Sequence, residues 1–522
     1  MNGMKLSIIR KSLAACSFFL LLLTALWAEA KEQADLVIVN AKIITMNKIQ
    51  PSASAFAVRG NKIFKVGSDD AIRRMIGDRT KIINAQKGVV LPGFIDSHIH
   101  PAVAVLFSTL GVNLTECKNA SETINKIKKY VNDHPELDKI TGFGFASDFF
   151  PSNGPDKEIL NKIEFKRPVF IAENSGHGAW VNSKALEILK IDKDTPDPLP
   201  GAHFYVRNAD GSPTGYLVEG AAFWPHLKTL NIGTVKEFKK GLKKFLPQLA
   251  EYGITSVYDA GMPAVEENSY KGLLEMEKAG DLPVRYFGSH YLISRKDALN
   301  AEPEMQKLKK LYTSELVRPL SIKISNDGFT AKGHFIQFDE SELLKILGPV
   351  FAANLDIHIH SVMEDCTNAV LNAIERLQAE YPGSRTRATL THLNRVYKSD
   401  MPRFAALKVI ANLQPASNLL SDFPAGSGSL LTDSPLYIIK DAVIGRGPSV
   451  ANETITVLEA LTCLTVNNAK QLKTEKYLGK IKEGYLADIV ILSGNPLTVK
   501  PEKITDIKVM KTIMNGKLVY EL

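Results

Sequence analysis

Runs of strand-forming residues are concentrated at the two ends of the chain. Asn and Gly separate the runs near the start, and the runs near the end include Asn515-Gly516, a dipeptide that favours a two-residue hairpin turn. The runs lie at 36–39, 42–45, 55–58 and 62–66, and again at 487–492, 508–514 and 517–520. Because both ends flank a long body with a different pattern, we expect residues 31–90 and 471–522 to form one small β-sandwich domain together.

The long body, residues 91–470, alternates strand-like runs with amphipathic helical patterns. Examples of such pairs are 168–172 with 183–190, 320–324 with 341–351, and 355–359 with 367–379. Alternation over this length predicts parallel βα units, whose commonest closed arrangement is the (β/α)8 barrel of the TIM type. We therefore predict an α/β fold in which a TIM-like barrel carries the small β-sandwich. A polar residue that ends a barrel strand lies at the mouth and is a candidate functional residue.

The first 30 residues have the pattern of an export signal. Lys5, Arg10 and Lys11 are basic, an apolar run extends from 12 to 27, and residues 28–30 read Ala-Glu-Ala, a small-x-small cleavage site. We predict that residues 1–30 are removed, that the mature protein is periplasmic or secreted, and that no stable membrane span is left after cleavage. Retention of the run as a membrane anchor and lipidation at Cys16 are the alternatives.

Charge and cysteine content exclude several other classes of protein. The formal net charge is +8 over 522 residues, and no block of Lys and Arg occurs, so we predict no nucleic-acid partner. The three cysteines beyond the signal, Cys117, Cys366 and Cys463, are widely spaced. Neither a disulfide framework nor a cysteine-type zinc site is therefore predicted. The oligomeric state cannot be read from this sequence.

A histidine pair, His98 and His100, follows the apolar run 88–95. Side chains at i and i+2 of a strand point to the same side, so both imidazoles can face the barrel axis and share one cation. Two hydrogen-bonded histidines at a strand end are the simpler reading of the pair alone.

Two more histidines end short strand-like runs, His360 after 355–359 and His392 after 388–391. Each alone is more easily explained as a packed histidine. Four histidines in the same kind of position are best explained by a divalent metal at the barrel mouth. His358, two residues before His360, is interpreted as a spare that packs or lies behind the ligands.

Lys323 and Asp422 are further candidates. Lys323 lies inside the run 320–324, where a lysine that faces into a barrel is costly unless it is paired or neutralised. If it points inward it could be carboxylated and bridge two metals; an outward position is equally open. Asp422, in Ser421-Asp-Phe-Pro424, could take a proton from bound water and pass it to a leaving amine, although the segment also reads as an ordinary turn.

These segments together resemble the amidohydrolase superfamily, and within it most closely the N-substituted formamide deformylase-like group. The resemblance covers most of the mature chain. Its most specific motifs are Pro92-Gly-Phe-Ile-Asp-Ser-His-Ile-His100 and the segment 479–492. Motifs at the level of the group lie at 176–182, 211–219, 253–259, Lys323 with Asp327-Gly328, Gln414-Pro415 and 421–424.

The resemblance implies a site for one or two divalent metal ions, with zinc as the default for a histidine-rich, redox-free site. His98 and His100 would bind one ion and His360 and His392 the other. Lys323 would be the carboxylated bridge between them.

The resemblance also implies the chemistry. A metal-bound hydroxide would attack an amide-type, non-peptide C–N bond of a small molecule, with the metals stabilising the oxyanion. Asp422 would touch the first metal and act as the proton shuttle. His177 would lie on the substrate side and polarise the scissile carbonyl, unless it is a loop histidine that caps Trp180 or Asn182.

The sequence departs from the family pattern in three places. His360 is followed by Ser-Val-Met-Glu364 in place of a Gly-Asp pattern, and Pro415 is followed by alanine in place of histidine. Only six residues separate Pro415 from Asp422, whereas a parallel crossover needs a dozen or more. We therefore expect an incomplete last βα unit. A catalytically impaired homologue that still binds metal or ligand is the alternative function.

The substrate itself cannot be read. A long insertion between about 140 and 250 is expected to cover the mouth of the barrel. Its aromatic residues suggest an apolar pocket wall, and core packing is the alternative; they are Phe143, Phe149, Phe150, Trp180 and Trp224.

Overall fold

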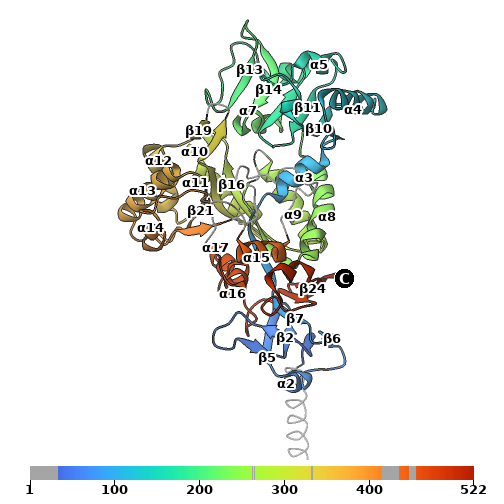
Figure 1. The fold of residues 1–522 in the computed structure, drawn as a ribbon, viewed down its shortest axis with the longest axis vertical. Helices are drawn as coiled ribbons and strands as arrows, with labels where there is room; N and C mark the ends of the chain where they lie inside the picture. Colours follow the sequence, from blue (N-terminus) through green and yellow to red (C-terminus); the bar gives the residue numbers. More distant parts are fainter. Residues whose placement is uncertain (1–32, 262, 264, 331–332, 414–433, 446–453) are drawn as a thin grey trace, which may run out of the picture.

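In the computed structural model, the described residues are 33–522 except 262, 264, 331–332, 414–433 and 446–453. They form three layers along the long axis: an insertion at one end, a barrel in the middle, and at the other end two β-sheets, one of which combines strands from both chain termini (Figure 1). No helix in these ranges is long and apolar enough to cross a membrane.

The barrel is a sheet of seven parallel strands in the order β22-β21-β20-β17-β16-β15-β8. The strands are β8 (Phe94–Ile99), β15 (Ile254–Asp259), β16 (Arg285–Leu292), β17 (Val317–Ser325), β20 (Asp356–Ser361), β21 (Ala388–His392) and β22 (Ile410–Asn412). The two edge strands meet, because the side-chain amide of Asn412 on β22 donates to Oγ of Ser97 on β8 at 2.9 Å. The sheet is therefore nearly closed, as the predicted TIM-like barrel requires. Residues 414–433, on which the prediction of an incomplete last unit rests, lie outside the described residues.

Helices connect the barrel strands and cover the outside of the sheet. They are α3 (Pro101–Thr109), α8 (Val235–Glu251), α9 (Glu266–Ala279), α10 (Arg295–Leu299), α11 (Ala301–Tyr312), α12 (Glu340–Ala352), α13 (Glu364–Glu380) and α14 (Met401–Ala406). In α13 the fully buried positions Cys366, Val370, Ile374 and Leu377 recur every three or four residues, so one face packs on the sheet. Three further helices, α15 (Pro435–Ile444), α16 (Val457–Thr462) and α17 (Asn468–Gln471), follow the last described barrel strand.

The insertion is a separate six-stranded sheet in the order β13-β14-β12-β11-β10-β9. Its elements are β9 (Val112–Asn113), α4 (Ala120–Asp133), β10 (Ile140–Phe145), α5 (Lys157–Asn161), β11 (Val169–Glu173), β12 (Gly178–Val181), α6 (Ser183–Leu189), β13 (Phe204–Arg207), β14 (Pro213–Val218) and α7 (Gly220–Phe223). The predicted pair 168–172 and 183–190 is therefore not a barrel unit. A strand followed by a helix looks the same in sequence whichever sheet it joins.

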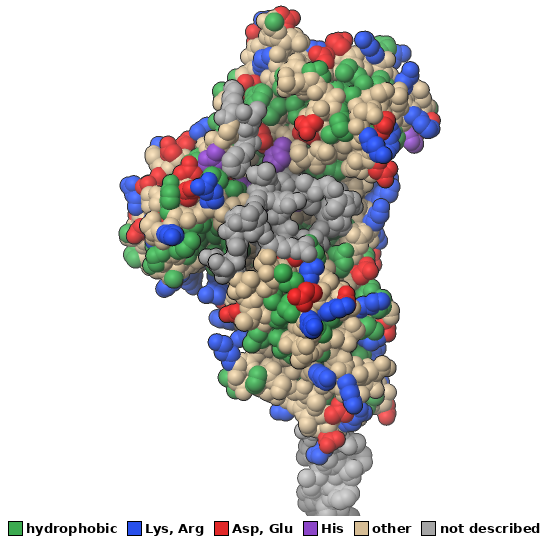
Figure 2. Space-filling view, viewed as in Figure 1, with side chains coloured by type: hydrophobic (Ala, Val, Ile, Leu, Met, Phe, Trp, Pro, Cys, Tyr) green, Lys and Arg blue, Asp and Glu red, His purple; other side chains and the backbone are tan. Residues whose placement is uncertain are grey.

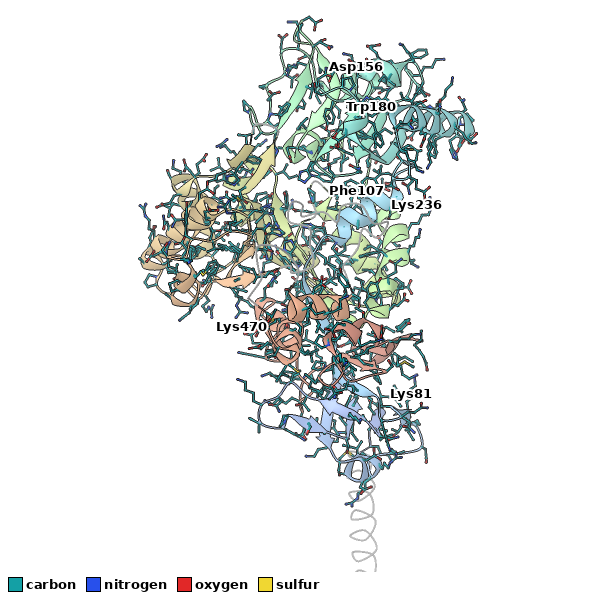
Figure 3. All side chains as sticks on the ribbon, viewed as in Figure 1. Lys81, Phe107, Asp156, Trp180, Lys236 and Lys470 are labelled. Atoms are coloured by element: carbon teal, nitrogen blue, oxygen red, sulfur yellow. The ribbon has the colours of Figure 1, made fainter. Side chains whose placement is uncertain are left out.

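The proposed aromatic pocket wall is mostly core. Phe143, Trp180 and Trp224 are 7%, 0% and 2% exposed. The Trp180 indole N–H donates to the backbone oxygen of Asp156 at 3.2 Å, inside the insertion (Figure 3). Phe143 stacks on Phe107 of α3, with ring centroids 4.6 Å apart. These three rings hold the insertion together and join it to the barrel rather than line an open pocket.

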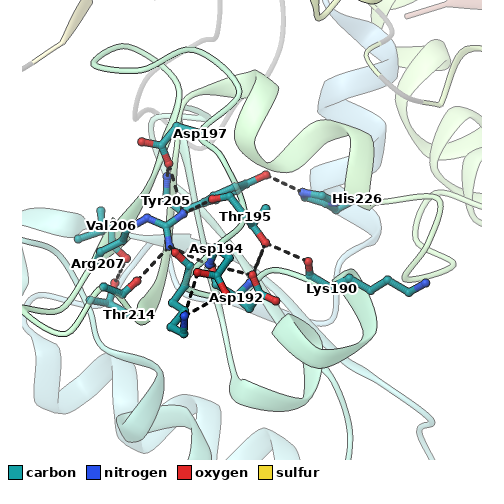
Figure 4. A network of polar contacts seen from close by, with 12 residues as sticks. Lys190, Asp192, Asp194, Thr195, Asp197, Tyr205, Val206, Arg207, Thr214 and His226 are labelled. Atoms are coloured by element: carbon teal, nitrogen blue, oxygen red, sulfur yellow. Dashed lines mark hydrogen bonds and ion pairs between the residues drawn. The ribbon is translucent and has the colours of Figure 1, made fainter.

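A loop of the insertion is fastened by Arg207 on β13 (Figure 4). Its guanidinium donates to the backbone oxygens of Asp192 at 2.9 Å and Gly211 at 3.0 Å, and lies 3.7 Å from the carboxylate of Asp197. The planar guanidinium, with its fixed set of N–H donors, suits several carbonyl oxygens at once.

One further sheet, in the order β25-β24-β23-β7-β2-β3, contains strands from both chain ends, and a second, in the order β5-β4-β1-β6, comes from the N-terminal part alone. Buried residues of the two sheets share one core, as the predicted β-sandwich of both chain ends requires. Their strands are β1 (Leu36–Val39), β2 (Lys42–Ile44), β3 (Ser52–Ala53), β4 (Ala55–Arg59), β5 (Lys62–Gly67), β6 (Lys81–Asn84), β7 (Val89–Pro92), β23 (Ile489–Leu492), β24 (Val509–Met514) and β25 (Lys517–Glu521), with α2 (Asp69–Arg73) after β5. Asn515 and Gly516 both have positive φ, 54° and 76°, as the predicted hairpin turn demands. The domain boundaries themselves stay a prediction.

Candidate metal centre

The predicted histidines come together inside the barrel. The ring of His98, on edge strand β8, lies 5.0 Å from the ring of His392, which ends β21 near the opposite edge of the sheet. His98 and His100 are 5.3 Å apart, and His360 and His392 are 4.5 Å apart, measured between ring centroids. Rings from both edges can meet at these distances only because the sheet curls round on itself.

His358 lies within the same cluster. Its Nε2 is 2.8 Å from Nδ1 of His98, and its side chain is 2% exposed. The sequence predicts that His358 is a spare that packs or lies behind the ligands, and its contact with the ring of His98 agrees with that position. The hydroxyl of Thr391 also lies 3.2 Å from Nδ1 of His98, so His358 and Thr391 both constrain that ring.

Lys323 points into the barrel. Its Cα is in register with that of His358 on β20 and with that of Tyr291 on β16. In-register residues of parallel strands share one face of the sheet, so Lys323 lies on the same face as the histidine rings. Its side chain is fully buried. The sequence left open whether the side chain of Lys323 points into the barrel or away from it. The pairing of β17 with β16 and β20 places it inside.

Asp327, the first residue of β18 (Asp327–Thr330), belongs to a motif named from the sequence, but no role was predicted for it. Its fully buried carboxylate lies 3.5 Å from Nε2 of His360 and 3.2 Å from Nε2 of His334. It also accepts the backbone N–H groups of Val362 at 3.0 Å and Met363 at 2.9 Å. The available signal was its position three residues after the apolar strand run 320–324.

Asp259, which ends β15, fastens the segment that carries the first histidine pair. Its carboxylate accepts the backbone N–H of Ala102 at 2.9 Å and that of Gly261 at 3.1 Å, and also the hydroxyl of Tyr286. Ala102 lies in the first turn of α3, which begins immediately after His100. Complete burial raises the pKa of Asp259 to about 7, against the opposing effect of these hydrogen bonds.

Of the two predicted catalytic residues, one lies outside the described residues and the other belongs to the insertion. Asp422, together with Gln414 and Pro415, falls in 414–433. His177 belongs to the insertion, directly before β12, and its Nδ1 is 2.9 Å from Oε2 of Glu219. In Figure 2 histidine side chains are visible at the junction between the insertion and the barrel.

The donor set fits a divalent metal ion. Buried imidazoles supply neutral nitrogen donors, which zinc and related ions prefer, and His100, His358 and His360 are each no more than 8% exposed. Within the described ranges, no three His, Cys, Asp or Glu side chains are already arranged as a metal-binding group.

Known proteins resemble the chain over nearly its whole length. A family model described as "Amidohydrolase family" matches residues 81–520. The N-substituted formamide deformylase of Arthrobacter pascens is 24% identical, over 94% of this chain and 99% of that protein. The putative amidohydrolase YtcJ of Bacillus subtilis is 25% identical, over 92% and 98%, and the protein LONG AFTER FAR-RED 3 of Arabidopsis thaliana is 25% identical, over 93% and 92%.

Solved structures share the fold. An uncharacterised metal-dependent hydrolase from Pyrococcus horikoshii superposes with a TM-score of 0.68 at 20% identity, over 90% of this chain and 99% of that one. Atrazine chlorohydrolase TrzN from Arthrobacter aurescens, in complex with zinc, gives a TM-score of 0.52 at 13% identity, over 93% and 95%.

Proposed function

The chain belongs to the amidohydrolase family, and from this premise we propose that it is a metal-dependent hydrolase of a non-peptide, amide-type C–N bond in a small molecule. The observation that carries the proposal is the set of histidine rings gathered from both edges of the barrel sheet, with His98 and His392 5.0 Å apart. The activity named for the Arthrobacter pascens relative, deformylation of N-substituted formamides, supports this class of bond.

The metal would be held by side chains that the barrel already brings together. We assign His98 and His100 to one ion and His360 and His392 to a second, with Lys323 between them as a carboxylated bridge. When bound, one or two zinc ions would supply Lewis acidity, which lowers the pKa of water and polarises a carbonyl oxygen.

The remaining roles belong to the protein. Asp327 and His358 orient the rings of His360 and His98 through the contacts described above. We propose that Asp422 carries the proton from the attacking water to the leaving amine. His177, on the insertion, would face the substrate side of the site.

We also propose that the mature protein acts outside the cytoplasm. The basic residues, the apolar run and the Ala-Glu-Ala sequence at 28–30 support this location. Edman sequencing of the protein released into a periplasmic fraction should begin at Lys31. A protein that stays in the cytoplasmic fraction with an intact N-terminus would rule out cleavage and export.

The test of the proposed activity combines metal analysis with a substrate screen. Protein reconstituted with Zn²⁺ should retain metal after gel filtration and should release amine from members of a panel of N-alkyl and N-aryl formamides and acetamides. Removing the metal with a chelator should abolish turnover, and adding Zn²⁺ should restore it.

A matched pair of histidine variants makes the screen specific. His98→Ala should lose metal and activity, whereas His134→Ala should keep both, because His134 is a surface residue of the insertion whose Nδ1 faces the exposed carboxylate of Glu136 at 3.1 Å. Failure of the wild-type protein to retain any divalent metal would overturn the proposal.

A further inference from the structure

A cavity of about 240 Å³ lies where the barrel meets the terminal sheets. Residues at the N-terminal ends of β16 and β17 line it from the barrel, and loop residues next to the terminal sheets line it from the other side (Figure 1). The histidines of the candidate metal centre lie at or near the C-terminal ends of their strands. Because the barrel strands are parallel, the cavity lies at the end of the barrel opposite the metal centre.

Arg318, the second residue of β17, supplies a cation to this cavity. One of its N–H groups donates to the hydroxyl of Tyr477 at 3.1 Å, and the guanidinium lies 5.8 Å from the centroid of the Phe287 ring. Within the part of the chain that the structure describes, no carboxylate pairs with Arg318. A guanidinium has five N–H donors, so Arg318 keeps donors for a ligand.

The hydroxyl of Tyr477 adds a second kind of donor beside Arg318. Because this hydroxyl accepts the N–H of Arg318, its own proton is left for another acceptor. A guanidinium binds a carboxylate through two parallel hydrogen bonds, and a neighbouring hydroxyl can donate a third. This side of the cavity is therefore suited to a carboxylate.

Glu315 brings the opposite charge to the same cavity. Its Oε1 accepts the side-chain amides of Asn61 at 3.2 Å and of Asn515 at 2.8 Å, which hold the carboxylate in place. Its other oxygen accepts no hydrogen bond from a described residue, and no ion pair joins it to Arg318 within the described ranges. The two charges are therefore held apart across the cavity, as a ligand that carries both signs requires.

The rest of the wall is apolar or already neutralised. Phe287 is 4% exposed, and Leu316 and Leu486 extend the apolar surface around it. Arg285, which also lines the cavity, is paired with Asp488, with Nε and Oδ2 2.8 Å apart. The cavity volume lies below the roughly 300–1,000 Å³ of pockets for drug-sized ligands, so its occupant is a small molecule.

We propose that this cavity binds a free α-amino acid with an apolar side chain. The ligand carboxylate accepts hydrogen bonds from Arg318 and Tyr477, and its ammonium group donates to Glu315. Its side chain packs on the apolar wall around Phe287. The site is separate from the metal centre, and the inference does not rest on the proposed function. Because the barrel and the terminal sheets share the cavity, the bound ligand stabilises the contact between them.

Three probes of similar shape test whether both charges are recognised. L-leucine carries both, 4-methylpentanoate lacks the ammonium group, and 3-methylbutylamine lacks the carboxylate. In isothermal titration calorimetry with the metal-loaded protein, L-leucine should bind at least about tenfold more tightly than either of the others, as expected for the loss of one hydrogen bond between charged groups. Equal affinity for L-leucine and 4-methylpentanoate, or no binding of L-leucine, would overturn the proposal.

Two conservative variants locate the probe in the cavity. Arg318→Gln removes the cation and Glu315→Gln the anion, and each new side chain can still form hydrogen bonds with its neighbours. Each should weaken L-leucine binding about tenfold. Glu315→Gln should also abolish the preference for L-leucine over 4-methylpentanoate, a change that a general loss of stability does not produce.

The matched control for these variants is Arg376→Gln. Arg376, on α13, forms an exposed pair with Glu340 of α12 at 2.9 Å, on helices that cover the outside of the barrel. This variant should bind L-leucine as the wild type does. Wild-type affinity in Arg318→Gln and Glu315→Gln would place the ligand elsewhere and overturn the proposal.

Removing the metal distinguishes this cavity from the metal centre, since an amino acid can also chelate a metal ion through its amino and carboxylate groups. L-leucine should bind the chelator-treated wild type with unchanged affinity and should raise its Tm as the ligand concentration rises. Binding that requires the metal would place L-leucine at the metal centre and overturn the proposal. None of these measurements uses turnover, so this site and the proposed function fail independently.

Discussion

At the scale of single residues, the candidate centre depends on groups that fix the direction of each imidazole. A histidine ring at a strand end can rotate about two bonds, so its position on the strand does not determine where its nitrogens point. Asp327 supplies that constraint for His360, and its two carboxylate oxygens also accept the backbone N–H groups that follow β20.

Replacing Asp327 by alanine is expected to affect both stability and metal content. The N–H groups of Val362 and Met363 lose their acceptor, and each such loss costs about 1–3 kcal/mol when the group is buried. We expect urea denaturation to show a loss of roughly 2–5 kcal/mol, and metal analysis to show less bound ion. Asp365→Ala is the control, since Asp365 is half exposed and contacts His334 at 3.5 Å. Wild-type stability and metal content in Asp327→Ala would refute this role.

At the scale of elements, helices are tied to strands by buried polar pairs. The clearest case joins α9 to β16. Nδ1 of His290 lies 2.9 Å from Oε2 of Glu266, the first residue of α9, and the other oxygen of that carboxylate accepts the backbone N–H of Tyr291. The negative charge at the start of α9 also suits the positive end of the helix dipole.

This pair predicts a pH dependence of stability. Burial lowers the pKa of His290, but the charge and hydrogen bond of Glu266 outweigh it, so the pKa is raised above the usual value. A raised folded-state pKa gives stability that is complete below the unfolded value, about 6.5, and is lost as pH rises through the folded value. Glu266→Gln should therefore lower the free energy of unfolding more at pH 6 than at pH 9.

Urea denaturation at several pH values measures this difference. Glu136→Gln serves as the control, because the His134–Glu136 pair is exposed to solvent and contributes little. An equal loss for Glu266→Gln at every pH would show that the pair is held by hydrogen bonding rather than by charge.

At the scale of the whole molecule, one buried ion pair joins the barrel to the sheets of the chain termini. Nε of Arg285, on β16, lies 2.8 Å from Oδ2 of Asp488, and both side chains are 4% exposed. Asp488 also accepts the backbone N–H of Asn515, at the turn of the C-terminal hairpin. The joint therefore connects a barrel strand with two points of the C-terminal sheet, the residue before β23 and the turn between β24 and β25.

Breaking this pair from one side should be costly. Asp488→Asn leaves the guanidinium of Arg285 buried without its counter-charge, for which about 3–5 kcal/mol is typical. Chemical denaturation measures the loss, and Glu521→Gln, which removes half of a more exposed pair with Lys511, should cost less than about 1 kcal/mol. An equal loss of unfolding free energy in Asp488→Asn and Glu521→Gln would mean that burial does not determine how much the Arg285–Asp488 pair contributes.

Much of this architecture could be predicted from patterns in the sequence. Alternating runs predicted the barrel, and the Asn515-Gly516 turn with the two β-rich ends predicted the terminal sheets. The histidine cluster was predicted because each member ends a strand run, a position that parallel strands bring to one edge. The roles of its members remain predictions.

Other features could not be predicted, because they depend on contacts between residues that are far apart in the sequence. The strand at 168–172 gives the same signal in either sheet, so its membership of the insertion could not be seen. The inward position of Lys323 follows from register with His358, which is a property of two strands. Asp327 and Glu219 are polar residues of turns and strand ends, and only the fold shows which histidine or backbone group each one meets.

The near-closed sheet also sets the order in which the metal centre can form. Thr391, next to His392, contacts His98 although the two residues are 293 positions apart in the chain. Contacts of such long sequence separation form late, because the entropy of closing a long loop must be overcome first. A nascent or truncated chain that ends before β21 lacks Thr391 and His392, both of which meet His98 in the folded protein. The second of the two proposed ions therefore requires a chain that has been synthesised at least through β21.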